Sequence, residues 1–137
     1  MQILLFGKPN SITSTLEEML GSRQEWTITV VSSIQESISI STAQHEDKSR
    51  SYDVIIGNLA AFSRKPNELV RALRQQFPAC PLLVLYSYRK PMLIRPLLEA
   101  GADGYLQNGH PEENVFEAVR TVAAGSRYLK PDFTYEQ

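Results

Sequence analysis

The chain has 137 residues, and its 14 lysine and arginine residues against 15 aspartate and glutamate residues give a formal net charge of −1. This length and a hydrophobic content of 42% predict one globular domain rather than a disordered chain. Apolar runs of about five residues are far shorter than the ~20 that span a bilayer, and the balanced charge argues against a nucleic-acid-binding domain.

Short β-like apolar runs alternate with longer helical patterns five times along the chain, which is typical of a parallel α/β sheet. Near-continuous apolar runs are expected for strands that are buried on both faces. The predicted strands are residues 1–6, 26–31, 53–57, 82–86 and 104–106. With right-handed crossovers they predict a doubly wound five-stranded parallel sheet in a three-layer α/β/α sandwich of the flavodoxin-like type.

The first predicted helix has Ser11 as its N-cap and Gly21 as its end. Its apolar face at helical spacing comprises Ile12, Leu16, Met19 and Leu20. The pattern after Ser32 fits both a helix and a strand, and we expect a short helix followed by a mobile loop through residues 44–48.

Prolines delimit the remaining helices. Pro66 fits the first turn of the next helix, whose apolar face comprises Leu69, Val70, Leu73 and Phe77. Pro96 would remove a hydrogen bond inside a helix at a cost of about 3 kcal/mol, so the helix before the fifth strand is expected to begin near Pro96 or to be kinked. The last helix spans residues 112–124, with Pro111 at its start and Gly125 as its end.

The N-terminal residues carry no basic leader and no long apolar segment, so we expect no signal peptide and a cytoplasmic protein. The single cysteine, Cys80, excludes an internal disulfide, and His45 and His110 lie far from it in sequence. We therefore expect no Cys/His metal site. Cys80 is instead expected to fill a small apolar space.

Residues 97–106, with the sequence LLEAGADGYL, closely resemble the receiver domain of bacterial two-component response regulators. The GADGYL segment and the later GSRYL segment at residues 125–129 are most similar to receivers that usually precede a helix-turn-helix. With the first strand and the YDVIIGNL segment at residues 52–59, the resemblance covers residues 1–129 and leaves residues 130–137 as a C-terminal tail.

The resemblance implies a phosphorylation site at the carboxyl ends of the strands. In that site acidic residues hold Mg²⁺, an aspartate accepts the phosphoryl group, and a hydroxyl and a lysine hold its oxygens. Aligned without gaps, this chain has Gly7 and Lys8 at the acidic pair, Asn58 at the phosphoacceptor, Tyr86 at the hydroxyl and Asn108 at the lysine. A slip of one residue would offer Ser87 as the hydroxyl, but it would not restore the carboxylates.

These replacements turn a pocket with net negative charge into one with a single positive charge, which should repel Mg²⁺. An amide is a poor nucleophile, so Asn58 is not expected to form an acyl phosphate. The resemblance thus points to a degenerate receiver, a pseudo-receiver that keeps the fold without the aspartyl-phosphate switch. Asp53 and Asp103 are not expected to substitute, because each precedes its strand and so lies away from the pocket.

Two pocket residues have alternative interpretations. Lys8 either donates to Asn58 inside the vacant acidic pocket or lies in solvent. Tyr105 falls where receivers carry an aromatic residue that changes rotamer on activation, or it is a static surface aromatic. The basic residues Arg64, Lys65, Arg71 and Arg74 are expected to form a solvated helix face. The predicted partner surface lies around the fifth strand and the helix before it, near Met92, Leu93, Ile94 and Tyr105.

We therefore expect a non-enzymatic, phosphorylation-independent signalling module that acts through a protein partner and needs no cofactor. Homodimerisation is expected by family analogy alone. Neither nucleic acid nor a membrane is expected to bind this chain by itself. The alternative is a flavodoxin-like binder of a small anion or nucleotide, with Lys8, Asn58 and Asn108 as donors at the carboxyl ends of the strands.

Overall fold

A computed structural model describes residues 1–33, 35 and 52–130 of the chain. In this part the sheet has six strands, all parallel, in the order β2-β1-β3-β4-β5-β6. They are β1 (Gln2–Phe6), β2 (Thr27–Val31), β3 (Val54–Asn58), β4 (Leu82–Tyr86), β5 (Gly104–Gln107) and β6 (Tyr128–Lys130). The predicted parallel α/β sheet is confirmed, and the predicted number of five strands is wrong.

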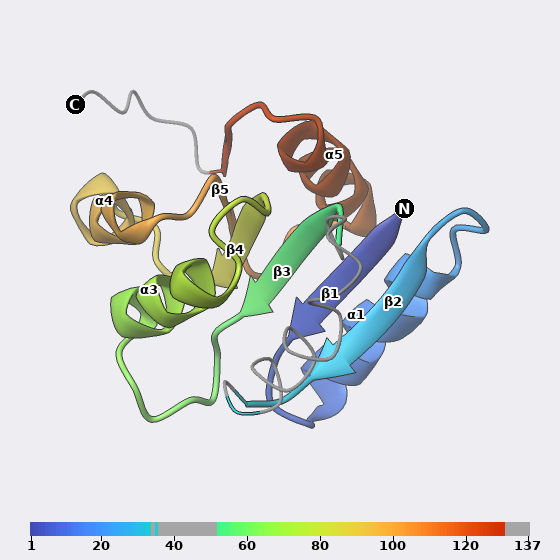
Figure 1. Cartoon of the computed structure of the whole chain (residues 1–137), viewed down its shortest axis with the longest axis horizontal. Coiled ribbons are helices and arrows are strands. Elements are labelled where there is room, and N and C mark those ends of the chain that lie inside the picture. The colour runs from blue at the N-terminus through green and yellow to red at the C-terminus, as the bar shows by residue number, and fades with distance from the viewer. Residues whose placement is uncertain (34, 36–51, 131–137) are drawn as a thin grey trace.

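Four helices of the described residues flank the sheet: α1 (Ser11–Gly21), α3 (Pro66–Gln76), α4 (Pro91–Ala100) and α5 (Glu112–Ala123). Helices α3 and α4 cover one face, and α1 and α5 cover the other (Figure 1). The predicted helix after Ser32 and the loop through residues 44–48 lie outside the described residues. Among the described residues, no helix has the length and apolar character needed to cross a bilayer.

The sixth strand depends on two glycines. Gly125 has a φ of 95°, which turns the chain back after α5 so that Tyr128 lies beside Gly104 of β5. A Cβ atom on Gly104 would lie only 2.6 Å from Cγ2 of Val122 and 3.1 Å from the carbonyl oxygen of Tyr128. The absence of a side chain at Gly104 therefore lets α5 and β6 both approach β5.

The N-cap of helix α1 lies one residue earlier in the chain than predicted. The cap is Asn10, not Ser11, because Oδ1 of Asn10 accepts a hydrogen bond of 3.0 Å from the backbone N–H of Thr13. The buried face comprises Thr13, Leu16 and Leu20. Ile12, which the apolar pattern assigns to the core face, is exposed instead.

Helix α4 begins at Pro91, so of the two predicted alternatives the one in which the helix begins near Pro96 is wrong. Pro91 lies at the first helical turn, where its missing N–H costs no helical hydrogen bond. Pro96 lies on the exposed side of α4, where water can bond the carbonyl oxygen that its ring leaves without a helical partner. A proline in this place therefore does not set the start of the helix.

Side chains alternate between two apolar cores, one on each face of the sheet. In β1, Leu4 and Phe6 pack with α3 and α4, whereas Ile3 and Leu5 pack with α1 and α5. All four side chains are fully buried. The carboxyl ends of β1, β3, β4 and β5 are thereby held at one edge of the sheet, where the sequence predicts the functional residues.

Candidate functional site

Asn58 is the last residue of β3, and its side chain is 0% exposed. Its Nδ2 donates a hydrogen bond of 3.2 Å to Oγ1 of Thr13 on α1. Its Oδ1 is buried and has no hydrogen-bond partner among the described residues. A buried amide with one satisfied and one unsatisfied end costs free energy, which marks this position as unusual in an otherwise apolar core.

Thr13 completes this pocket, and the sequence pattern missed it. Its side chain is buried, and the Asn10 cap fixes the helical turn that carries it. A Cβ atom built on Gly7 would lie 2.8 Å from Oγ1 of Thr13 and 3.3 Å from Cβ of Asn58. The space beside the end of β1 is therefore filled by the threonine. The sequence does carry a signal for this burial. Thr13 lies three positions before Leu16 and seven before Leu20, so it shares their buried helix face.

Lys8 is half-buried and lies over an aromatic ring. Its Nζ lies 4.9 Å from the ring centroid of Phe62, which is a cation–π contact. Phe62 in turn stacks on Phe6, with ring centroids 4.8 Å apart and an interplanar angle of 4°. The predicted hydrogen bond from Lys8 to Asn58 is not formed, since Oδ1 of Asn58 has no partner in the described part of the chain.

Tyr86 and Asn108 meet through the backbone, because the Asn108 N–H donates to the Tyr86 carbonyl oxygen at 2.8 Å. The Tyr86 ring makes an edge contact with Tyr88, with centroids 4.8 Å apart. Asn108 also lines a groove of about 440 Å³ between α1 and the loop after β5. The groove is mainly apolar, and neither Lys8 nor Asn58 lines it. The three proposed anion donors therefore do not share this groove.

Tyr105 is 0% exposed, so the prediction of a surface aromatic is wrong. Its hydroxyl donates a hydrogen bond of 2.7 Å to the carbonyl oxygen of Tyr88, in the loop between β4 and α4. Burial raises the pKa of Tyr105 above its ordinary value. Ile94 is also buried, whereas Met92 and Leu93 are exposed as predicted.

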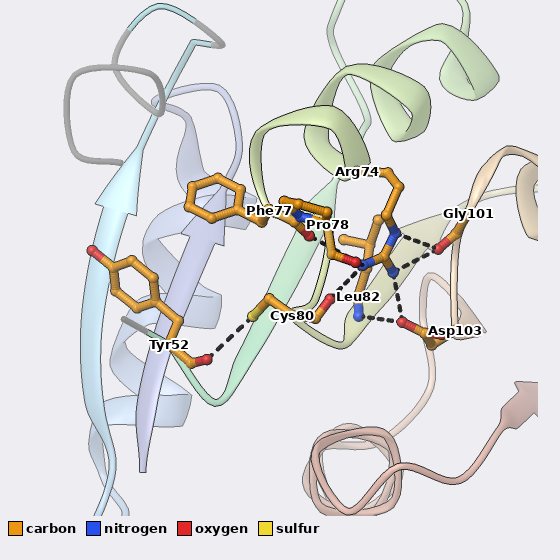
Figure 2. A network of polar contacts seen from close by, with 8 residues as sticks. All are labelled: Tyr52, Arg74, Phe77, Pro78, Cys80, Leu82, Gly101 and Asp103. Carbon is orange, nitrogen blue, oxygen red and sulfur yellow. Dashed lines mark hydrogen bonds and ion pairs between the residues drawn. The ribbon is translucent and has the colours of Figure 1, made fainter. Parts of the chain in front are cut away.

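A second polar cluster lies at the opposite edge of the sheet, where β4 and β5 begin (Figure 2). Asp103 directly precedes β5, and its Oδ2 accepts from Arg74 at 2.7 Å and from the Leu82 N–H at 2.9 Å. Asp53 directly precedes β3, and its Oδ2 accepts from the Gln2 N–H at 2.7 Å. Both aspartates are therefore away from the Asn58 pocket, as the sequence predicts.

Arg74 is the centre of that cluster, so the prediction that it belongs to a solvated basic face is wrong. Its guanidinium donates to the carbonyl oxygens of Gly101, Phe77, Pro78 and Cys80 at distances from 2.7 to 3.2 Å. Arg is suited to this task because its five N–H donors lie in one rigid plane. Cys80 is buried as predicted, and its Sγ lies 3.2 Å from the carbonyl oxygen of Tyr52.

Comparison with known proteins supports the receiver resemblance. No protein-family model matches the chain. The chain is 35% identical over 60 residues to the oxygen regulatory protein NreC of Staphylococcus carnosus, which covers 44% of the chain and 28% of that protein. It is 31% identical over 83 residues to the transcriptional regulatory protein DegU of Brevibacillus brevis, which covers 61% of the chain and 35% of that protein. The matches thus span only about a third of these curated relatives.

Solved structures show the same fold over nearly the whole chain. A LuxR-family two-component response regulator from an Aurantimonas species has a TM-score of 0.78 at 19% identity, covering 96% of this chain and 90% of that one. The chemotaxis protein CheY4 of Vibrio cholerae has a TM-score of 0.72 at 20% identity, covering 88% of this chain and 97% of that one. The chain therefore has the fold of receiver domains and, over part of its length, resembles two-component response regulators in sequence.

Proposed function

We propose that the chain is a phosphorylation-independent, non-enzymatic receiver domain, a pseudo-receiver that signals through contacts with another protein. The observation that carries the proposal is the buried pair of Asn58 and Thr13 at the carboxyl ends of the strands, joined at 3.2 Å. Asn58 stands at the end of β3, where the receiver resemblance places the phosphoacceptor. An amide in this place cannot act as the nucleophile that a carboxylate would be.

The residues of this pocket do not fit the Mg²⁺ ion that the receiver family implies. Mg²⁺ prefers carboxylate oxygens and water in octahedral geometry. In this chain Gly7 and Lys8 stand at the acidic positions, and the Thr13 side chain fills the space beside Gly7. Within the described residues, no group of three or more His, Cys, Asp or Glu side chains could hold a metal ion. The proposed mechanism therefore includes no metal-dependent step.

Tyr86 and Asn108, at the hydroxyl and lysine positions of the proposed alignment, offer no replacement for a phosphoryl site. The Asn108 side chain is neutral, and its backbone N–H is already bonded to Tyr86. At these two positions a phosphoryl group would find neither the cation that a lysine supplies nor the donor of a small hydroxyl.

Intact-mass spectrometry after incubation with acetyl phosphate and Mg²⁺ tests the proposal. We expect no phosphoryl adduct, while a response regulator with a complete acidic pocket, treated in parallel, gains one. Native spectra of the same samples should show no change of oligomeric state. A stoichiometric adduct on this chain would contradict the proposal and would show that a surrogate residue accepts phosphate.

A second candidate function, small-ligand binding, is favoured by the groove beside Asn108. Its volume of about 440 Å³ lies in the range of small-molecule sites. Its apolar lining from Ile12, Leu16 and Met19 does not suit an anion. Thermal shift against phosphate, nucleotides and cyclic nucleotides tests the anion alternative. A reproducible rise of the melting temperature with one of these ligands would favour a ligand-binding function over the pseudo-receiver function.

A further inference from the structure

The loop between β5 and α5 begins with an asparagine that is followed by a glycine, Asn108 and Gly109. The side-chain amide carbon of an asparagine, Cγ, can be attacked by the backbone nitrogen of the next residue, and asparagine is among the thermolabile residues of proteins. Glycine hinders this attack least, because it has no Cβ atom and its backbone turns freely. The sequence therefore places a reactive pair in this loop.

The structure leaves both reacting groups of the pair accessible. Asn108 is half-buried beside the groove between α1 and this loop, and its side chain forms no hydrogen bond among the described residues. Gly109 is exposed with a φ of 98°, and a Cβ atom added to it would meet no atom within 4 Å. Within the same part of the chain, its N–H donates to no acceptor. No contact therefore keeps the Gly109 nitrogen from the Asn108 amide.

Two other asparagines lack this combination because of their hydrogen bonds. Asn58 is fully buried, and the N–H of Leu59 after it donates to the carbonyl oxygen of Leu85 at 3.2 Å. The Asn10 side chain is engaged as the cap of α1, since its Oδ1 accepts from the Thr13 N–H at 3.0 Å. In each pair at least one reacting group is therefore held by another partner.

The remaining asparagines, Asn67 and Asn114, lie inside α3 and α5. Helical backbone angles do not direct the nitrogen of the next residue toward Cγ. The N–H of Glu68, which follows Asn67, also donates to the carbonyl oxygen of Lys65 at 3.0 Å. Asn108 is thus the asparagine of this chain whose amide and following nitrogen are both accessible.

We propose that Asn108 is a site of spontaneous covalent modification, at which a cyclic imide forms and opens to aspartate or isoaspartate. The Gly109 nitrogen attacks Cγ of Asn108 and gives its proton to a base in the solvent. The bond between Cγ and Nδ2 breaks, and Nδ2 takes up a proton and leaves as ammonia. Water then cleaves one of the two carbonyl–nitrogen bonds of the ring. The chain gains water and loses ammonia, so the reaction needs no oxidant or reductant.

Both products change the edge of the sheet to which Asn108 belongs. Each adds one negative charge to the formal net charge of −1, at the position where the receiver alignment has a lysine. Isoaspartate also inserts a methylene group into the backbone before Gly109. The Asn108 N–H is bonded to the Tyr86 carbonyl oxygen at 2.8 Å, so the added atom has to be accommodated in the loop toward α5. Residues 107–110 line the groove beside α1, so the modification changes its wall.

Incubation of the purified full chain at neutral and at mildly alkaline pH tests the inference. Tandem mass spectrometry of its peptides locates each residue at which an amide nitrogen is replaced by oxygen. We expect this change at Asn108 and not at Asn10, Asn58, Asn67 or Asn114. The rate should rise with pH, because the attacking nitrogen has to lose its proton. The isoaspartyl product should accept a methyl group from a protein isoaspartyl carboxyl methyltransferase, and ion exchange should separate the more negative chain.

Two variants and an unfolded sample sharpen the test. Asn108→Gln should react at least about tenfold more slowly at this position, because its longer side chain closes a larger and less favourable ring. Asn67→Gln, a change at another half-buried asparagine, is the matched control and should leave the rate at Asn108 unchanged. Thermal melts confirm that both variants fold. In the folded chain Asn108 should react within about tenfold of its rate in urea, because no local unfolding is needed to expose it.

Three results would overturn the inference. The first is a folded chain that stays unmodified at Asn108 while the chain in urea reacts there, which would show that the fold protects the pair. The second is an equal rate at Asn108 and Asn67 in the folded chain. The third is a gain of negative charge that persists unchanged in Asn108→Gln, which would place the modification elsewhere.

Discussion

The Arg74 side chain shows how much a single residue contributes to this fold. Its guanidinium joins the end of α3 to the residues before β4 and to the C-cap of α4 through their carbonyl oxygens. Arg74→Lys should lower the free energy of unfolding by about 2–4 kcal/mol, because an ammonium group cannot reach these acceptors in one plane. Urea denaturation measures this change. Arg71→Lys, on the exposed side of α3, should change stability by less than about 0.5 kcal/mol, and equal losses would contradict the role of Arg74.

Tyr105 links stability to alkaline pH. Burial raises its pKa above the ordinary value of 10.0, so the folded chain keeps the phenolic proton after the unfolded chain has lost it. At pH values below this ordinary pKa, both the folded and the unfolded chain hold the proton, so the contribution of Tyr105 to the free energy of unfolding does not depend on pH. Above it, the free energy of unfolding falls by up to about 1.4 kcal/mol per pH unit. Tyr105→Phe should therefore flatten the alkaline decline of stability.

Urea midpoints measured between about pH 8 and pH 11 test this expectation. At neutral pH the variant should lose about 1 kcal/mol, the value of its hydrogen bond to Tyr88. Tyr88→Phe is the matched control, because Tyr105 donates to the backbone of Tyr88 and not to its hydroxyl. If the urea midpoints of Tyr105→Phe and of the unmodified chain fall in parallel as the pH rises, another titrating group causes the alkaline loss of stability.

Among the glycines of the described residues, Gly104 in β5 leaves the least room for a side chain. Gly104→Ala would place a methyl group against Val122 of α5 and the Tyr128 carbonyl of β6, at 2.6 and 3.1 Å. Both neighbours would have to move, so we expect a loss of about 1–3 kcal/mol in the free energy of unfolding. Gly21→Ala, at the end of α1 where nothing lies within 4 Å of the added Cβ, should be neutral or slightly stabilising. Thermal melts of the two variants should separate clearly, and equal melting temperatures would contradict this account.

The central strands could be predicted from the sequence because a strand buried on both faces is a continuous apolar run, as in LLVLY of β4. The strand β6 could not, because three half-buried residues carry no alternation and their position depends on Gly104 and Gly125. The start of α4 was missed because the penalty of Pro96 was assumed to apply at a solvent-facing position. Local sequence patterns do not show which residues pack against Gly104 or whether Pro96 faces solvent.

For the site, the sequence located Asn58 at the end of β3, but it could not reveal what surrounds Asn58. The packing of Thr13 against Asn58 joins residues 45 positions apart. The contact of Lys8 with Phe62 likewise depends on where the loop after β3 lies. Spacing along the chain predicts which residues reach the same sheet edge, whereas the partner of each side chain follows from three-dimensional packing.

Across the whole molecule, polar side chains gather at both edges of the sheet. The edge where β4 and β5 begin carries the Arg74 and Asp103 cluster, which ties α3, α4 and the sheet together (Figure 2). The opposite edge carries the closed Asn58 pocket, and beyond it the Tyr105 hydroxyl secures the start of α4. At this second edge the Asn58 amide is held by its hydrogen bond to Thr13.

The response of the whole molecule to Mg²⁺ follows from this closed edge. A ligand at one hundred times its Kd stabilises the folded state by about 2.7 kcal/mol, so a working acidic pocket would raise the urea midpoint at millimolar Mg²⁺. This chain offers Lys8, Asn58 and the Thr13 hydroxyl at that edge, and no carboxylate cluster within its described residues. We expect Mg²⁺ at about 10 mM to change the free energy of unfolding by less than ~0.3 kcal/mol relative to KCl of equal ionic strength. A saturable increase of the free energy of unfolding with Mg²⁺ that KCl does not reproduce would reveal a cation site. It would also contradict the proposal that the domain works without phosphorylation.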